Sequence, residues 1–171
     1  MRNSRNSLSH TCDWMYSTDY DSPLGEMLIV SDGESLCGVW FYGQKNFPIY
    51  DNLIQNDNLA IFKDVKRWFD DYFNGLNPKI DFKIKAEGSE FRLKVWNMLS
   101  EIPYGETLTY GEIAREISPK MSAQAVGGAV GHNPISIIIP CHRVLGANGK
   151  LTGYAGGIDR KMELLRLEKI I

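Results

Sequence analysis

The feature that most constrains the fold is a change of hydrophobic periodicity near the middle of the chain. Before residue 85, short apolar runs around Met15–Tyr20, Glu26–Val30 and Ser35–Phe41 are separated by turn-forming residues such as Pro23 and Gly25. Runs of this kind predict an antiparallel sheet. After residue 88, apolar residues recur three and four positions apart, which predicts helices. We therefore expect an α/β (α+β) protein with the sheet first and the helices second.

One amphipathic helix is predicted within the sheet region. Apolar side chains recur with helical spacing from Ile61 to Phe73, and Gly75 and Pro78 end the pattern. We expect this helix to cover one face of the sheet, and the run 80–84 to add another strand. The chain is accordingly divided into a flexible N-terminus at 1–12, a sheet-plus-helix domain at 13–85 and a mainly helical domain at 86–171.

The second half carries three helix-start signals. Ser89 precedes an apolar stripe, and Thr109 with Glu112 forms a capping box, in which each side chain satisfies a free backbone donor of the other residue. Ser118-Pro119 should break that helix, and a further helix opens at Ser122. Helix, turn and helix predict a helix-turn-helix, although a generic helical hairpin has the same spacing.

The last of these helices contains Gly127-Gly128, and each glycine costs roughly 1 kcal/mol relative to alanine in a helix interior. Small residues permit close approach of another surface, either a nucleic-acid groove or a helix inside the protein.

The net charge is −2, yet basic residues cluster between Arg115 and Lys161. That cluster is either a phosphate-facing patch or an ordinary solvated surface.

Three cysteines cannot all pair within one chain, and the N-terminus lacks the apolar stretch of a secretory signal. No run approaches the roughly 20 apolar residues of a membrane span. We therefore expect a cytoplasmic protein without a membrane partner.

The strongest chemical signal follows the apolar run 135–139, predicted as a short buried strand ending at Pro140. Cys141, His142 and Arg143 come next. Proline stops the strand ladder, so Cys141 should lie at a strand end, where neighbouring bases favour the nucleophilic thiolate. Adjacent side chains on an extended segment point in opposite directions, so His142 would reach Cys141 through a water. A purely structural Cys-His pair is the alternative.

The stretch from Ser122 to Val144, which contains Pro-Cys-His-Arg-Val, and the later stretch Leu-Thr-Gly-Tyr-Ala-Gly-Gly-Ile at 151–158 resemble the O6-alkylguanine-DNA alkyltransferases. These are the methylated-DNA–protein-cysteine methyltransferases, here of the bacterial Ogt-like kind. The resemblance is close over 86–171 and looser over 14–84, where it rests on the Asp-Ser-Pro-Leu-Gly turn at 21–25. It implies DNA repair by direct damage reversal, an irreversible single-turnover transfer of an alkyl group from O6-alkylguanine, and from O4-methylthymine, to Cys141. It implies no cofactor.

The resemblance also assigns roles to individual residues. Cys141 is the nucleophile, and His142, polarised by Glu168, deprotonates it through a water. Tyr110 lies at the target phosphate and assists proton transfer, while Asn133 joins the recognition helix to the active-site strand. Val144, Tyr154 and Ala155 complete the substrate pocket. The expected DNA-binding residues are Ser122, Ala123, Gln124, Ala125, Gly127, Gly128 and Arg143. The expected partner is double-stranded DNA, bound by a monomer through the minor groove with flipping of the O6-alkylguanine base.

Two departures from the family pattern stand out. Gln124 replaces the arginine that fills the vacated base position, and Ala155 replaces a serine beside the pocket tyrosine. Some relatives hold zinc, but His10, Cys12 and Cys37 supply three ligands where structural zinc takes four, so no metal is predicted.

Two rival functions remain. A non-catalytic alkyl-lesion-binding protein would lack the cysteine, and a cysteine hydrolase would need an oxyanion hole and water to regenerate its thiol.

Overall fold

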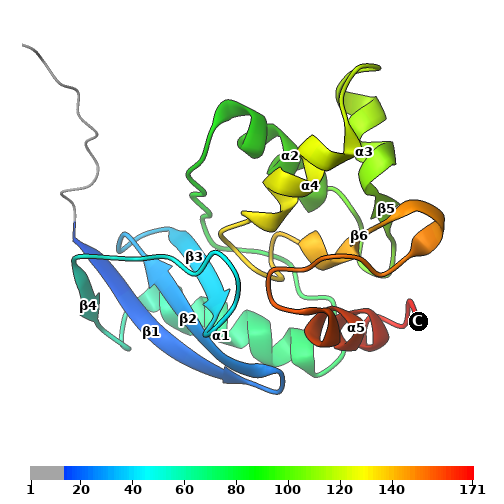
Figure 1. Ribbon diagram of the computed structural model, residues 1–171. Coiled ribbons are helices and arrows are strands. Elements are labelled where there is room, and N and C mark those ends of the chain that lie inside the picture. The colour runs from blue at the N-terminus through cyan, green and yellow to red at the C-terminus, as the bar shows by residue number, and fades with distance from the viewer. Residues whose placement is uncertain (1–13) are drawn as a thin grey trace, which may run out of the picture.

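The computed structural model describes residues 14–171, so the segment expected to be flexible, with His10 and Cys12, lies outside the described residues. Figure 1 shows the sheet and the helical part side by side. The strands are β1 (Met15–Ser22), β2 (Gly25–Ser31), β3 (Leu36–Phe41), β4 (Leu53–Gln55), β5 (Leu108–Thr109) and β6 (Val144–Leu145). The helices are α1 (Ala60–Phe73), α2 (Glu90–Ser100), α3 (Tyr110–Ile117), α4 (Ala123–Gly131) and α5 (Ile158–Leu167), with 3-10 turns at Cys141–Arg143 and Ala147–Gly149.

The sheet has the strand order β3-β2-β1-β4, and its first three strands form the predicted antiparallel meander. The β1–β2 turn is closed by the Ser22 hydroxyl, which accepts from the Leu24 amide at 3.1 Å, and Gly25 supplies a φ of +127°. The short strand β4 pairs in parallel with β1 and was not predicted, since three residues show no alternation. The run 80–84 is not a strand, because only Ile84 bridges to Leu36 at the edge of β3.

Helix α1 covers one face of this sheet, as predicted (Figure 1). Its buried stripe packs against sheet residues in one core cluster. That stripe consists of Ile61, Phe62, Val65, Trp68, Phe69 and Tyr72.

The predicted helix starts in the second half are confirmed. Ser89 caps α2 by accepting from the Arg92 amide, and Ser122 caps α4 by accepting from the Ala125 amide. Both bonds of the Thr109–Glu112 capping box are present, at 2.8 and 3.1 Å. Helix α4 packs against α2 and α3, so the helix-turn-helix pair is part of a three-helix group.

The segment 135–139 is buried as expected, but the strand prediction is wrong. Ile135 makes one bridge to Val39, and the chain then folds back on itself through Ile137, whose φ is +72°. The Asn133 side chain replaces the strand ladder, since its Oδ1 accepts from the Ile135 amide and its Nδ2 donates to the Ile139 carbonyl at 2.8 Å. Cys141 consequently begins a 3-10 turn rather than ending a strand.

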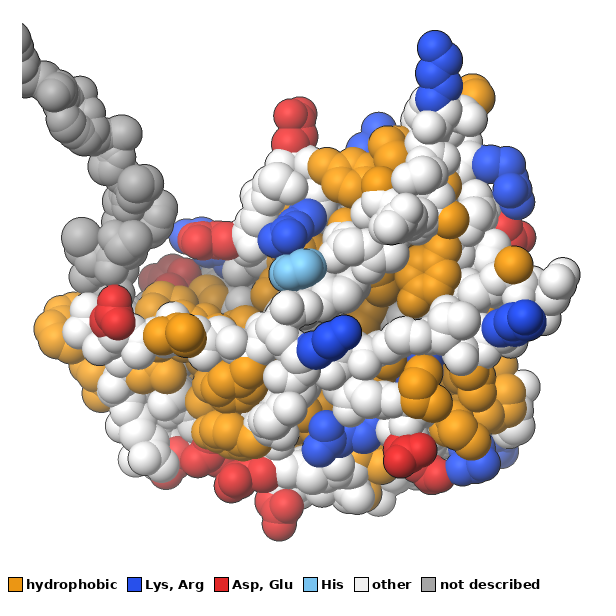
Figure 2. Space-filling view, viewed as in Figure 1, with side chains coloured by type: hydrophobic (Ala, Val, Ile, Leu, Met, Phe, Trp, Pro, Cys, Tyr) orange, Lys and Arg blue, Asp and Glu red, His pale blue; other side chains and the backbone are white. Residues whose placement is uncertain are grey.

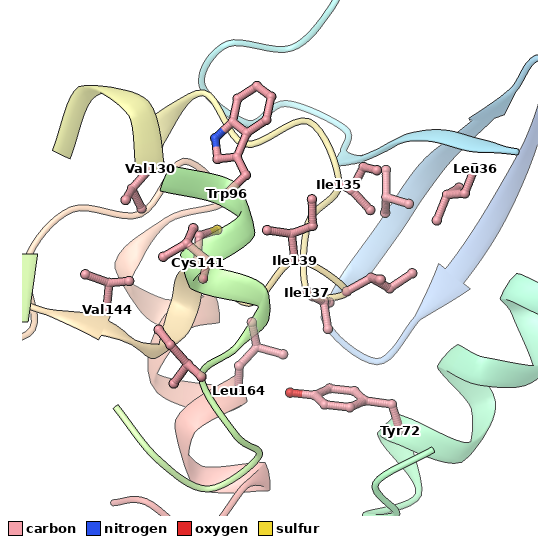
Figure 3. Close-up of a cluster of buried hydrophobic side chains, with 14 of the residues drawn as sticks. Leu36, Tyr72, Trp96, Val130, Ile135, Ile137, Ile139, Cys141, Val144 and Leu164 are labelled. Carbon is pink, nitrogen blue, oxygen red and sulfur yellow. The ribbon is translucent and has the colours of Figure 1, made fainter. Parts of the chain in front are cut away.

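One hydrophobic core joins the two halves of the chain. Figure 3 shows Leu36 and Tyr72 from the sheet half facing Ile135, Ile137 and Leu164 from the other half. The segment that carries Cys141 is therefore anchored on the sheet. Within residues 14–171, no helix has the length and apolar character needed to cross a membrane.

Candidate active site

Cys141 lies at the floor of a cavity and is only 5% exposed. Burial raises the pKa of its thiol, and the Asn133 amide and the Lys161 ammonium oppose that rise without cancelling it. The expectation that Arg143 helps to ionise Cys141 is wrong, because the Arg143 guanidinium binds Glu168 instead. A buried thiol in this state needs a base before it can act as a nucleophile.

His142 is fully buried beside Cys141 in the 3-10 turn. Its Nε2 lies 2.6 Å from Glu168 Oε2, and because the carboxylate can only accept, Nε2 carries the proton. Burial lowers the pKa of the imidazole more than Glu168 raises it, so the ring is neutral near pH 7 and Nδ1 has a free lone pair. Among residues 14–171, none hydrogen-bonds to Nδ1. His142 therefore has the protonation state of a general base.

Glu168 follows the last turn of α5, and both of its carboxylate oxygens are saturated with donors. Arg143 donates through Nε to Oε1 at 2.8 Å and through Nη2 to Oε2 at 3.1 Å. The Gly105 amide donates to Oε1, and the Tyr72 hydroxyl donates to Oε2 at 2.6 Å. Burial alone would disfavour the charge, but the hydrogen bonds from His142, Arg143 and Tyr72 lower the pKa of Glu168 to about 2.

Arg143 was expected among the DNA-binding residues, and the structure contradicts this. Its remaining nitrogen, Nη1, donates to the Ile102 carbonyl at 2.8 Å, so the guanidinium is used up within the protein. The residue is 9% exposed. It acts as a clamp on Glu168, in keeping with the rule that buried charges are paired.

The cavity above Cys141 has a volume of about 560 Å³. Of the predicted pocket residues, Tyr154 and Ala155 line it, whereas Val144 is fully buried and does not. Tyr110 and the α4 residues Gly127 and Gly128 also line the cavity. The Tyr154 hydroxyl is buried and has no hydrogen-bond partner within residues 14–171. The cavity thus combines a nucleophile, two phenols and a glycine-lined wall.

Two residues of the sheet half also line the cavity and were not predicted. The Lys45 amide donates to the Ala155 carbonyl at 3.0 Å, and Asn46 Nδ2 donates to the Gly131 carbonyl at 3.0 Å. The loop after β3 therefore ties together the two C-terminal segments that flank the cavity. No local pattern in the sequence signals this, because both bonds span more than 80 residues.

Lys161 was counted in the basic cluster, but it is fully buried. Its Nζ donates to the carbonyls of Val144, Thr152 and Gly153 at 2.6, 2.9 and 3.3 Å. Burial lowers the pKa of this ammonium to about 8. Lys161 thus joins β6, next to Cys141, to the loop that leads to Tyr154, and it is not part of a phosphate-facing surface.

The outer face of α4 is open. Ala123, Gln124, Ala125 and Gly128 are exposed, and a Cβ built on Gly128 would meet nothing within 4 Å. Packing inside the protein therefore does not explain the second glycine.

Figure 2 shows acidic side chains gathered along the edge below the sheet, whereas most Lys and Arg side chains on this face lie over the C-terminal part. The charge distribution favours approach of a polyanion to the α4 side.

Two family models match the chain in sequence. The 6-O-methylguanine DNA methyltransferase ribonuclease-like domain matches residues 15–86, and the DNA binding domain of the same name matches residues 90–170. The chain belongs to the 6-O-methylguanine DNA methyltransferase family. The range that matches the DNA binding domain includes Cys141, and the family resemblance drawn from the sequence is confirmed.

Individual relatives agree with this assignment. A methylated-DNA–protein-cysteine methyltransferase of Methanosarcina acetivorans is 48% identical over 155 residues, which cover 90% of this chain and 98% of that protein. One from Haemophilus influenzae is 46% identical, covering 91% and 87%. The crystal structure of Mycobacterium tuberculosis OGT in complex with DNA matches with a TM-score of 0.84 at 42% identity, covering 90% of this chain and 92% of that one.

Proposed function

We propose that this chain repairs DNA by moving an alkyl group from O6 of guanine, and from O4 of thymine, irreversibly to Cys141. The observation that carries the proposal is the position of Cys141, which lines an open cavity and is followed by a buried His142 held by Glu168. A C–S bond forms as the alkyl C–O bond breaks. The thiol proton passes to His142, and the departing base anion takes up a proton. The balance requires no cofactor, and each molecule acts once.

His142 is the base in this scheme. Its Nε2–H is fixed on Glu168, so only Nδ1 can accept the proton of Cys141, relayed by a water molecule. The ionised Glu168 stabilises the imidazolium that results, as a buried carboxylate does behind a catalytic histidine. Asn133 supports the step from the other side, because its amide favours the thiolate and also fixes the loop that leads to Cys141.

The cavity would receive the flipped base. Burial raises the pKa of Tyr110, so its phenol keeps its proton at neutral pH and can donate to the leaving purine. The free Tyr154 hydroxyl and the backbone around Ala155 offer hydrogen bonds to the base edge. Val144 does not line the cavity and would support it indirectly, because its carbonyl accepts from Lys161, which also holds the loop before Tyr154.

Double-stranded DNA would meet the exposed face of α4 through its minor groove. The small residues Ala123, Ala125, Gly127 and Gly128 let the helix backbone approach closely, with Ser122 at its start. Extruding the target base costs a few kcal/mol. Gln124 would occupy the vacated space and hydrogen-bond to the orphaned partner base. The protein would act as a monomer in the cytoplasm, where a reducing environment preserves the thiol.

The rival functions fare less well. A non-catalytic lesion-binding protein has no use for a nucleophile backed by a neutral buried histidine. A cysteine hydrolase would release its acyl group and recover the thiol.

Intact-mass measurement after incubation with a duplex containing O6-methylguanine separates the three functions. Alkyl transfer predicts one stable methyl per chain, located on Cys141, and a stoichiometric loss of activity. An unmodified protein that binds the duplex would overturn the proposal, as would continued turnover.

A further inference from the structure

Among residues 14–86, Tyr72 is the one side chain that hydrogen-bonds to the catalytic pair, His142 and Glu168. It lies on α1, 96 positions before Glu168, and is 1% exposed. Figure 3 shows its ring extending from α1 with the hydroxyl directed toward Leu164 of α5. That hydroxyl lies 2.6 Å from Glu168 Oε2 and 3.4 Å from His142 Nε2.

Packing alone does not account for the hydroxyl. Tyr72 stacks on Trp68 and meets Phe73 edge to face, so a phenylalanine would make the same ring contacts. A buried phenol without a partner is destabilising, and the partner here is an ion, which makes the bond a strong charge-assisted one. Burial and the Glu168 charge both raise the pKa of Tyr72, so the phenol is always a donor.

The bond determines how Glu168 acts on His142. Oε2 is the oxygen that His142 binds, and Tyr72 fixes the position of that same atom. Each added donor also makes the carboxylate a weaker base, so Tyr72 limits how far Glu168 can raise the pKa of His142. The other charged or titratable groups that face the pair are Arg143, Lys161 and Tyr104, together with Cys141 itself.

We propose that Tyr72 is a positioning residue for alkyl transfer, holding Glu168 Oε2 against His142 so that the sheet half completes the catalytic network. The proposal rests on the function given above. It makes α1 part of the reaction machinery as well as a cover for the sheet.

The test compares Tyr72→Phe with the wild type and with Tyr20→Phe, a matched control. The Tyr20 hydroxyl donates to Asp70 Oδ1 at 2.6 Å, a tyrosine–carboxylate bond of the same kind that involves neither His142 nor Glu168. The rate of Cys141 alkylation is measured from pH 5 to 9 by intact mass. A single-stranded O6-methylguanine oligonucleotide serves as substrate, to reduce effects on duplex binding and base extrusion.

We expect Tyr72→Phe to react about tenfold more slowly at neutral pH, the loss of one charge-assisted hydrogen bond. The pH below which the rate falls should also move higher. Without the Tyr72 hydrogen bond, Glu168 is a stronger base and raises the pKa of His142. Tyr20→Phe should follow the wild-type profile. A wild-type rate and profile in a folded Tyr72→Phe protein would overturn the proposal. If the wild type itself acquires no alkyl group, the function fails instead.

Incorporating 3-fluorotyrosine at position 72 provides a second measurement that keeps the fold and the hydroxyl. The more acidic phenol donates a stronger hydrogen bond to Glu168. The pH below which the rate falls should therefore move lower, in the opposite direction to Tyr72→Phe. If the pH below which the rate falls is unchanged in this protein, that result also counts against the proposal.

Discussion

Replacing Lys161 by methionine should loosen the substrate cavity and destabilise the protein. Lys161 is fully buried and holds three backbone carbonyls, two of them on the loop that precedes Tyr154. Methionine has a similar length and fills the same space, but it donates no hydrogen bond. The substitution therefore removes the connection without leaving a large void.

The size of the effect follows from the three acceptors. Thr152 and Gly153 are exposed, so water can replace the lost donor there, whereas Val144 is fully buried. One unsatisfied buried carbonyl costs about 1–3 kcal/mol. The substitution also removes the desolvation cost that lowers the pKa of Lys161 to about 8, which offsets part of the loss. We expect a net loss of about 1 kcal/mol and a Tm lower by about 2–4 °C for a chain of this size.

Thermal unfolding of Lys161→Met, the wild type and Lys150→Met measures the effect. Lys150 is an exposed lysine next to the same loop, so its substitution should leave Tm within about a degree. The transfer rate of Lys161→Met should fall with every substrate, because Tyr154 and the Val144 backbone lose their support. A Lys161→Met protein as stable and as fast as the wild type would refute the role given to the three hydrogen bonds.

Three further outcomes are expected. Cys141→Ser should abolish transfer while duplex affinity, measured by fluorescence anisotropy, stays within a fewfold, because phosphate contacts dominate binding; any residual transfer contradicts the assignment. The folded-state pKa of Glu168, about 2, lies below its unfolded value, so its stabilisation is complete above about pH 5 and is lost as pH falls toward 2; acid denaturation curves of Glu168→Gln should lack this component. Gln124→Ala should slow repair of duplex O6-methylguanine markedly and alter reaction with a single-stranded lesion little; equal rate changes on both substrates argue against a base-replacing role.

Local signals predicted the elements whose stability is local. Ser89, Ser122 and the Thr109–Glu112 pair mark helix starts because a cap binds the backbone three residues away, which is visible in any short window. The α1 stripe was likewise predictable, since one face of that helix is buried against the sheet.

Other features depend on contacts between residues that are far apart in the sequence, which no short stretch of sequence reveals. Five residues, Ile-Ser-Ile-Ile-Ile at 135–139, have strand composition, yet Asn133 takes over the hydrogen bonds that a ladder would make. Arg143 and Lys161 looked like surface cations, and their burial depends on acceptors far along the chain. Glu168 was identified only through the family resemblance. Tyr72 did leave a signal, because a hydroxyl at the end of a buried apolar stripe needs a partner, but the partner could not be deduced from the sequence.

The residues behind Cys141 are held more firmly than the cavity in front of it. We therefore expect the residues behind it to set the overall rate and those in front of it to set the preference between substrates. Behind the thiol, Glu168 accepts five hydrogen bonds from four residues, so the base side has no freedom to adapt. In front of it, the cavity is bounded by glycines and by a loop held through Lys161, which leaves room for different alkyl groups. Substitutions behind the thiol should therefore scale the reaction of every substrate equally, whereas substitutions in α4 should change the ratio between duplex and single-stranded substrates. Measuring both rates for each variant assigns a residue to one side or the other without a structure of the complex.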